Sequence, residues 1–243
     1  MKALILAAGR GSRLSPLTDR LPKCLTEVCG TPILIKQIEN LHECGITDIT
    51  VVTGYLSHIL EAAIRGKYPE IRILESVDYA TTNNMYSAYL AREAVAGDSF
   101  LMMNADVYFD ASVIRSLLDC PYPNAIAVDV GKYREESMKV RAQHGRLTEI
   151  AKTIAAEQAL GTSVDVYKFS LEAAHAFFVR CEEYIVTHKD RGQWSEVALC
   201  DILADMEFRA CPVGGRWMEI DTPEDLVSAQ ILFSSKTAEN REK

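Results

Sequence analysis

The amino-acid sequence predicts an α/β protein whose sheet is doubly wound, mainly parallel and mixed. Strand-like runs alternate with helix-like stretches over the first 130 residues, the order expected of parallel strands joined by helices. The first run, 2–7, is apolar without alternation, as in a strand buried on both faces. Because 243 residues fit one large domain, we expect a single domain over 1–233 and a polar tail over 234–243.

The elements of the first half follow from this alternation. A helix is expected over 32–45, because apolar residues recur at helical spacing between Pro32, which suits a first turn, and Gly45, which suits a helix end. The remaining runs are assigned in the same way. In chain order they are strand 48–54, helix 56–68, strand 71–76, helix 83–97, strand 99–106 and strand 125–130.

After residue 130 the pattern changes. Two strands are expected within 138–152, around a turn at His144-Gly145. A closing helix is expected over 222–233, because a threonine and a proline stand at its start. The elements between them are strand 163–170, helix 171–188, strand 207–213 and strand 216–220.

The composition disfavours several classes of protein. A net charge of −8 argues against a nucleic-acid partner, because a phosphate backbone requires a basic face. No apolar run approaches the ~20 residues of a membrane span. Seven cysteines, an odd number without a C-x-x-C pair, favour reduced thiols over zinc or disulfides. We therefore expect a cytoplasmic protein without nucleic-acid or membrane partners, and the sequence leaves open whether it forms a homo-oligomer.

The loop after the first strand suits a phosphate. Gly9 and Gly11 let backbone N–H groups approach an anion without side-chain obstruction. Leu14 replaces the third glycine of a dinucleotide fingerprint, and no G-K-[ST] P-loop follows. The cations Arg13 and Lys23 in this proline-stiffened loop suit a triphosphate. From the glycine spacing alone, a plain turn with surface cations explains the loop equally well.

Two aspartates end apolar strands. Asp106 is the last residue of the stretch LMMNAD, which ends the expected strand 99–106. Asp221 is the last residue of the stretch WMEID. Ligands of doubly wound sheets bind at the carboxyl ends of strands, where two carboxylates can share one hard cation. A cap or turn is the alternative for each aspartate taken alone. Glu219 is left without a role.

The stretch LAAGRGSRLSPLTDRLPKCL resembles the signature of the nucleotidyltransferases that make NDP-sugars and CDP-alcohols, G-x-G-x-R-x-x-P-L-T followed by P-K-x-L. The matching residues are Gly9, Gly11, Arg13, Pro16, Leu17, Thr18, Pro22, Lys23 and Leu25. This resemblance implies a Rossmann-like nucleotide-diphospho-sugar transferase fold. It implies that the loop holds the nucleotide, through residues Ala7, Ala8, Gly9 and Gly11.

The same resemblance implies roles for the charged residues. Arg13 and Lys23 are expected to act on the nucleotide phosphates as catalytic residues, and Asp106 and Asp221 are expected to bind Mg²⁺. The segment YATTNNMYSAYLA departs from the pattern of sugar-phosphate enzymes and is similar to the phosphocholine cytidylyltransferase-like branch. In that branch the matching residues, which are expected to bind the nucleotide, are Thr82, Asn83, Asn84 and Ser87. A helix N-terminus capped by Thr82 or Asn83 explains the segment equally well.

The acceptor end of the site is defined by three residues. Lys152 stands where the family places a lysine on the acceptor phosphate, although Thr153 replaces the usual proline. If the acceptor is phosphocholine, its trimethylammonium group requires aromatic faces or carboxylates, for which we favour Trp194 with Glu196. The residues do not separate phosphocholine from other phosphorylated alcohols or phosphonates.

The predicted activity is therefore transfer of CMP from CTP to a phosphorylated small alcohol or a phosphonate, with Mg²⁺ and with release of pyrophosphate. One alternative is a sugar-1-phosphate nucleotidyltransferase that makes an NDP-sugar. A second is a non-catalytic nucleotide-binding subunit, which the joint presence of Arg13, Lys23, Asp106 and Asp221 disfavours. The expected partners are small-molecule substrates.

Overall fold

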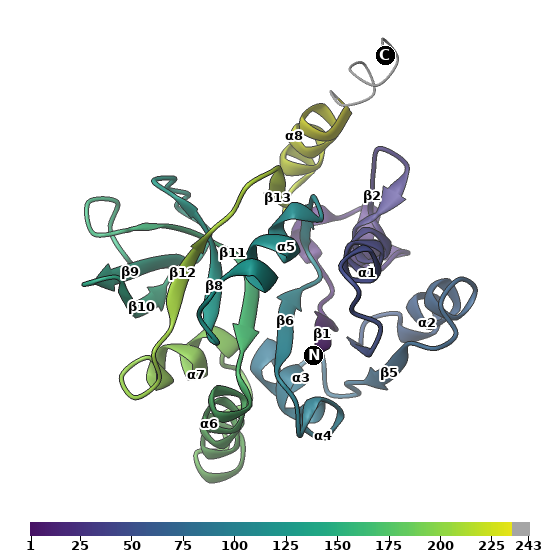
Figure 1. Ribbon diagram of the computed structural model, residues 1–243. Helices are drawn as coiled ribbons and strands as arrows, with labels where there is room; N and C mark the ends of the chain where they lie inside the picture. The colour runs from purple at the N-terminus through teal and green to yellow at the C-terminus, as the bar shows by residue number, and fades with distance from the viewer. Residues whose placement is uncertain (235–243) are drawn as a thin grey trace.

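The computed structural model describes residues 1–234 and confirms the α/β class. Nine strands form the central sheet: β1 (Lys2–Ala7), β4 (Ile49–Thr53), β5 (Arg72–Glu75), β6 (Phe100–Asn104), β8 (Ala125–Val130), β9 (Lys139–Gln143), β10 (Arg146–Ala151), β11 (Gly161–Phe169) and β12 (Arg209–Pro212). Their order is β5-β4-β1-β6-β11-β8-β12-β10-β9 (Figure 1). The sheet is parallel from β5 to β6 and mixed beyond, because β11 runs antiparallel to both of its neighbours.

Helices separate the strands, as the alternation predicts. They are α1 (Ile33–Glu43), α2 (Ser57–Arg65), α3 (Asn84–Leu90), α4 (Arg92–Val95), α5 (Ser112–Asp119), α6 (Leu171–Glu182), α7 (Ser195–Ile202) and α8 (Pro223–Ser234). The hairpin of β9 and β10 turns at His144 and Gly145, which have φ of 52° and 80°. Positive φ at both central residues suits the twist of a two-residue hairpin.

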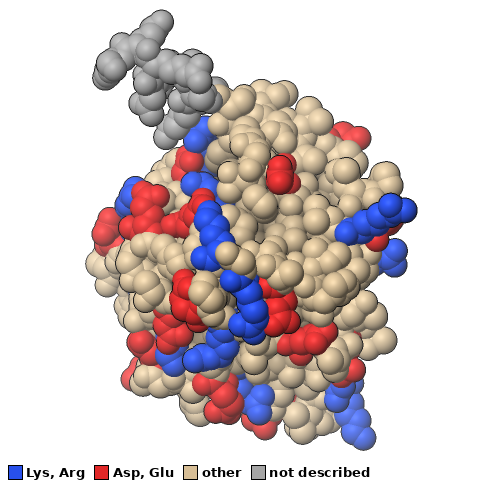
Figure 2. Space-filling model, turned by 90° about the vertical axis from the view of Figure 1, so that its right-hand side faces the viewer, with Lys and Arg blue, Asp and Glu red and all other residues tan. Residues whose placement is uncertain are grey.

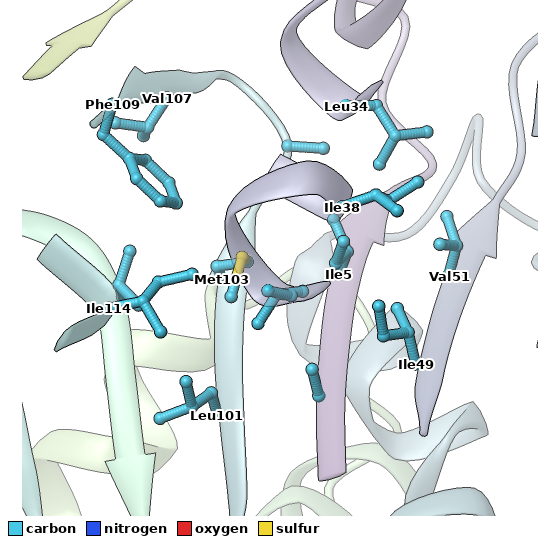
Figure 3. Close-up of a cluster of buried hydrophobic side chains, with 14 of the residues drawn as sticks. Ile5, Leu34, Ile38, Ile49, Val51, Leu101, Met103, Val107, Phe109 and Ile114 are labelled. Atoms are coloured by element: carbon cyan, nitrogen blue, oxygen red, sulfur yellow. The ribbon is translucent and has the colours of Figure 1, made fainter. Parts of the chain in front are cut away.

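Both faces of the sheet are buried. Ile5 of β1 packs in a cluster with Leu34 and Ile38 of α1, shown in Figure 3. The next residue toward the N-terminus, Leu4, points to the opposite face and packs in a cluster with Phe177 of α6. Successive side chains of a strand point to opposite faces, so an apolar run such as β1 requires helices on both sides.

Some boundaries differ from the expectations. The helix expected over 83–97 is divided at Ala91 into α3 and α4, and the helix expected over 171–188 continues beyond α6 as a π-helical turn, Glu183–Thr187. Helix α7 was not predicted. Ser234, placed by the sequence in the tail, is the last residue of α8, and residues 235–243 lie outside the described residues.

Two short pairings were not predicted, although the strand expected over 216–220 is present as β13. They are β2 (Glu27–Val28) with β3 (Thr31–Pro32), and β7 (Val107–Phe109) with β13 (Trp217–Glu219). The second pairing is important, because it brings the end of the chain to the end of β6.

The surface and helices add two observations. On the face shown in Figure 2, Lys and Arg side chains lie next to Asp and Glu side chains. Within residues 1–234, each helix is too short or too polar to cross a membrane.

Candidate active site

Backbone hydrogen bonds bring three distant segments together at the carboxyl ends of β1 and β6. The N–H of Ala105 donates to the carbonyl of Leu6 at 3.0 Å, which places the glycine loop beside Asp106. The N–H of Ile220 donates to the carbonyl of Asp106 at 2.9 Å, which places Asp221 on the other side. Both aspartates predicted at strand ends therefore lie at one edge of the sheet.

In the glycine loop, Gly11 leaves space for the side chain of Lys23. Gly11 has φ of +67°, and a Cβ added there would lie 2.6 Å from the Cβ of Lys23, so a side chain at this position would collide with the lysine stem. Lys23 itself begins a short 3₁₀ turn, Lys23–Leu25, behind Pro22. The proline-stiffened loop thus contains 3₁₀ turns, and Lys23 packs against Gly11.

Lys23 bridges the two aspartates. Its Nζ lies 2.9 Å from Oδ2 of Asp106 and 2.6 Å from Oδ1 of Asp221, and a guanidinium nitrogen of Arg13 lies 2.8 Å from Oδ2 of Asp221. Burial alone would lower the pKa of Lys23, but the two carboxylates together raise that pKa above its usual range. Burial alone would raise the pKa of Asp221, but Lys23 and Arg13 lower it.

A third carboxylate, which sequence analysis left out, completes an acidic cluster. Glu219 ends β13 and lies two residues before Asp221, on the same side of the chain, so that Asp106, Glu219 and Asp221 each place an oxygen within 4.8 Å of the others. Burial, followed by the charges of Asp165 and Asp106, raises the pKa of Glu219 to about 8. The alternation of side chains along a strand was the signal that should have revealed it.

The cluster fits a hard divalent cation. Oxygen donors are the ligands that Mg²⁺ prefers. The Oδ1 atom of Asp106 is buried and has no hydrogen-bond partner within the described residues, so its lone pairs are free to accept a ligand. Asp106, Asp221 and Glu219 are therefore the residues that would hold such an ion.

The asparagine segment, residues 82–87, has features of both a helix N-cap and a pocket wall. Asn83 caps α3 by accepting from the N–H of Asn84 at 2.8 Å, while Thr82, Asn83, Asn84 and Ser87 all line the pocket. The amide of Asn84 is shared, because its Oδ1 accepts from the N–H of Ser195 at 2.7 Å and its Nδ2 contacts Oε2 of Glu196 at 3.4 Å. Asn84 thus links α3 to the first turn of α7.

Two buried carboxyl groups, Asp165 and Glu196, line the same pocket. Glu196 is 2% exposed and Asp165 is 8% exposed, and the hydroxyl of Tyr167 lies 2.9 Å and 2.8 Å from their oxygens. A phenol has one proton, so the second of these contacts is a hydrogen bond only when one carboxyl group is protonated. Burial and the charge of Glu196 raise the pKa of Asp165 to about 7. Their other donors, Asn104, Asn84 and Ser195, are neutral.

Sequence analysis missed Asp165 and Asn104. Asp165 interrupts the apolar pattern of β11 with a charge, has φ of 56°, and lies where the pairing of β11 with β8 shifts register. A carboxyl group within a buried strand is costly unless it is paired or functional, and this was the available signal.

Lys152 and Trp194 lie together at the pocket wall. The Nζ of Lys152 is 5.3 Å from the centroid of the Trp194 ring, within the range of a cation–π contact. Trp194 is 44% exposed, so its ring is accessible.

All predicted site residues except Gly11 line one pocket of about 240 Å³. They are Ala7, Ala8, Gly9, Arg13, Lys23, Thr82, Asn83, Asn84, Ser87, Asp106, Lys152, Trp194, Glu196 and Asp221. The cations Arg13 and Lys23 thus line a single cavity together with five carboxyl groups, those of Asp106, Asp165, Glu196, Glu219 and Asp221.

Comparison with known proteins identifies a family for this chain. The family model described as MobA-like NTP transferase domain matches residues 3–163. The chain is similar to CMP-5'-(3-aminopropyl)phosphonate synthase of Streptomyces rubellomurinus, at 30% identity over 99% of the chain and 40% of that protein. It is also similar to choline-phosphate cytidylyltransferase of Streptococcus pneumoniae, at 40% identity over 48% of the chain and 49% of that protein. The matches thus span less than half of the length of these two relatives.

A solved structure shares the fold. The inositol-1-phosphate CTP transferase from T. maritima superposes with a TM-score of 0.81 at 21% identity, over 98% of this chain and 96% of that chain. This likeness confirms the fold class expected from the sequence.

Proposed function

This chain belongs to the MobA-like NTP transferase family, and on that premise we propose that it is a Mg²⁺-dependent cytidylyltransferase. It transfers CMP from CTP to a phosphorylated small alcohol or a phosphonate and releases pyrophosphate. The observation that carries the proposal is the position of Lys23, whose ammonium joins Asp106 and Asp221 beside the glycine loop. We further propose that residues 1–233 act as one domain in the cytoplasm, where its seven free thiols would stay reduced.

The nucleotide end is assigned to the loop and the asparagine segment. Backbone groups around Gly9 and the side chains of Thr82, Asn83 and Ser87 would contact the nucleotide, since all of them line the pocket. Amide side chains can pair with both donors and acceptors of a cytosine edge or a ribose. Two similar proteins are named for CMP or cytidylyl transfer, which favours CTP as the donor.

The phosphate end is assigned to the cations and the acidic cluster. Arg13 and Lys23 would neutralise the triphosphate, and Asp106, Asp221 and Glu219 would hold the divalent ion. When bound, that ion supplies charge neutralisation at the α-phosphate.

The reaction needs positioning more than proton transfer. An oxygen of the acceptor phosphate attacks the α-phosphorus of CTP, one P–O bond forms, and the bond to the β-phosphate breaks to release pyrophosphate. Because a phosphate monoester is already ionised near neutral pH, the attack requires no general base. Lys152 would orient the acceptor phosphate, and Arg13 and Lys23 would stabilise the charge of the leaving group.

The acceptor end favours a cation. Asp165 and Glu196 are buried with neutral donors, so a positively charged group would compensate their charge. The ring of Trp194 holds the ammonium of Lys152 in this structure, and a trimethylammonium or aminoalkyl group could occupy that ring face while Lys152 turns to the phosphate. This arrangement favours phosphocholine-like acceptors or aminoalkyl phosphonates over uncharged sugar phosphates.

A pyrophosphate-release screen tests the proposal. The purified protein is assayed with Mg²⁺ and each of CTP, UTP, GTP and ATP against phosphocholine, phosphoethanolamine, 3-aminopropylphosphonate and glucose 1-phosphate. We expect CTP with a cationic acceptor to give the highest kcat/KM. Preference for glucose 1-phosphate would support the sugar-nucleotide alternative, and no turnover with any pair would contradict the enzymatic assignment.

A further inference from the structure

The ammonium of Lys23 lies where the proposed metal ion would bind. Its Nζ is 2.9 Å from Oδ2 of Asp106 and 2.6 Å from Oδ1 of Asp221. Mg²⁺ requires oxygen ligands at about 2.1 Å in a near-octahedral shell. An ammonium group between the two carboxylates and a divalent ion bound by the same two carboxylates therefore exclude each other.

The local charges add to this exclusion. Two carboxylates of the cluster, Asp106 and Asp221, are ion-paired with Lys23, Asp221 is also paired with Arg13, and the lysine side chain is only 12% exposed. A divalent ion that binds both Asp106 and Asp221 must therefore displace the ammonium of a largely buried lysine. Displacement of the ammonium is unfavourable unless another anion is available to receive it, because a buried charge without a partner is costly.

A bound nucleotide would bring such an anion close to Lys23. The lysine packs against Gly11 in the same loop that would hold the nucleotide, and its flexible stem can turn without movement of the backbone. A bound triphosphate would offer oxygens beside the loop, so the lysine could exchange carboxylate partners for phosphate partners.

We propose that Lys23 acts as a resident counter-ion which keeps the divalent ion out of the acidic cluster until a nucleoside triphosphate binds. Metal and nucleotide then bind cooperatively, and each strengthens the binding of the other by the same factor. The inference rests on the metal and nucleotide parts of the proposed function and is independent of the acceptor. Failure of the acceptor screen would leave it standing.

Binding of Mn²⁺ without nucleotide tests the inference, with free Mn²⁺ measured by electron paramagnetic resonance. Mn²⁺ shares the oxygen ligands of Mg²⁺. In Lys23→Met the cluster has no resident ammonium, and we expect its Mn²⁺ affinity to rise by about 10- to 100-fold, the usual range of coupling between two ligands. The double variant Lys23→Met with Asp106→Asn should lose this gain.

Lys152→Met is the matched control. It removes one positive charge from the same pocket, but its ammonium contacts the Trp194 ring and not the cluster. We expect a clearly smaller rise in Mn²⁺ affinity than for Lys23→Met. Equal rises in the two variants would show a general effect of pocket charge and would overturn the inference, as would a folded Lys23→Met protein with unchanged or weaker Mn²⁺ binding.

Wild-type calorimetry covers the case in which Lys23→Met does not fold. CTP is titrated into the protein at a series of Mn²⁺ concentrations, and the known association of Mn²⁺ with CTP in solution is subtracted. We expect the protein to add coupling of about tenfold or more beyond that in solution. Additive binding, with no excess coupling, would overturn the inference.

Discussion

Replacement of Asp165 by Asn should stabilise the protein at neutral pH. Asp165 is buried, and its pKa is raised to about 7 by burial and by the charge of Glu196. Asn has the shape of the protonated acid: its Nδ2 can donate to the Tyr167 oxygen, and its Oδ1 can accept from Asn104. Asn also tolerates the φ of 56° at this position. The variant therefore keeps the hydrogen bonds and removes a costly charge.

The magnitude follows from the difference between the folded and unfolded proton affinities. A carboxyl group with a pKa of about 7 in the folded chain and an ordinary value of 3.8 loses up to about 4 kcal/mol of stability on ionisation, at about 1.36 kcal/mol per pH unit. The unfolded chain releases this proton at lower pH, so wild-type stability falls as pH rises from about 4 to about 7. The variant should lack this decline.

Urea denaturation at pH 4, 6 and 7.5 measures the effect. Asp165→Asn should match the wild type near pH 4 and exceed it by a few kcal/mol at pH 7.5, with unchanged m-values. Exposed Asp48, replaced by Asn, controls for the loss of one negative charge. An equal difference at pH 4 and pH 7.5, or a less stable variant at pH 7.5, would refute the reasoning.

The KM for a cationic acceptor should rise in the same variant, because the site gains stability by losing a charge that would bind substrate.

The remaining predictions concern the nucleotide and acceptor ends. Asp106→Ala should lower pyrophosphate release by about 10²-fold or more in a folded protein, the scale on which one electrostatic group acts on a transition state; near-normal release would contradict the metal assignment. Gly11→Ala should cost about 1–3 kcal/mol in urea denaturation, because alanine at φ of +67° is strained and its Cβ collides with Lys23; unchanged stability and kcat/KM would contradict this packing. Trp194→Leu should raise the KM for a cationic acceptor by about 2- to 30-fold and leave the KM for CTP unchanged, as expected for loss of a cation–π contact. An equal rise in the KM for glucose 1-phosphate would show that Trp194 does not bind a cation. CTP should raise the Tm more than the other three nucleotides at equal concentration; an equal response to all four would undo the base assignment.

Local sequence patterns predicted many of the residues that line the site. The glycine loop could be found because Gly9, Gly11, Arg13 and Lys23 are close in sequence, and Gly11 is required by a contact with a residue only twelve positions away. Asp106 could be found because an apolar strand ends beside it. Glu219 and Asp165 have weaker sequence signals, side-chain alternation for Glu219 and a carboxyl group within a buried strand for Asp165. Their positions also depend on tertiary structure, because the end of β13 is set by its pairing with β7 and the position of Asp165 by a register shift between β11 and β8.

The sequence by itself determined the α/β class, the two-sided burial of β1 and the identity of the loop that bears the cations, because each of these is set by the spacing of residues along one segment. Only the tertiary structure decided that Lys23 bridges Asp106 and Asp221, which are 83 and 198 residues away from it. The physical reason is that parallel pairing of β1 with β6, and antiparallel pairing of β7 with β13, bring segments together that no local pattern relates.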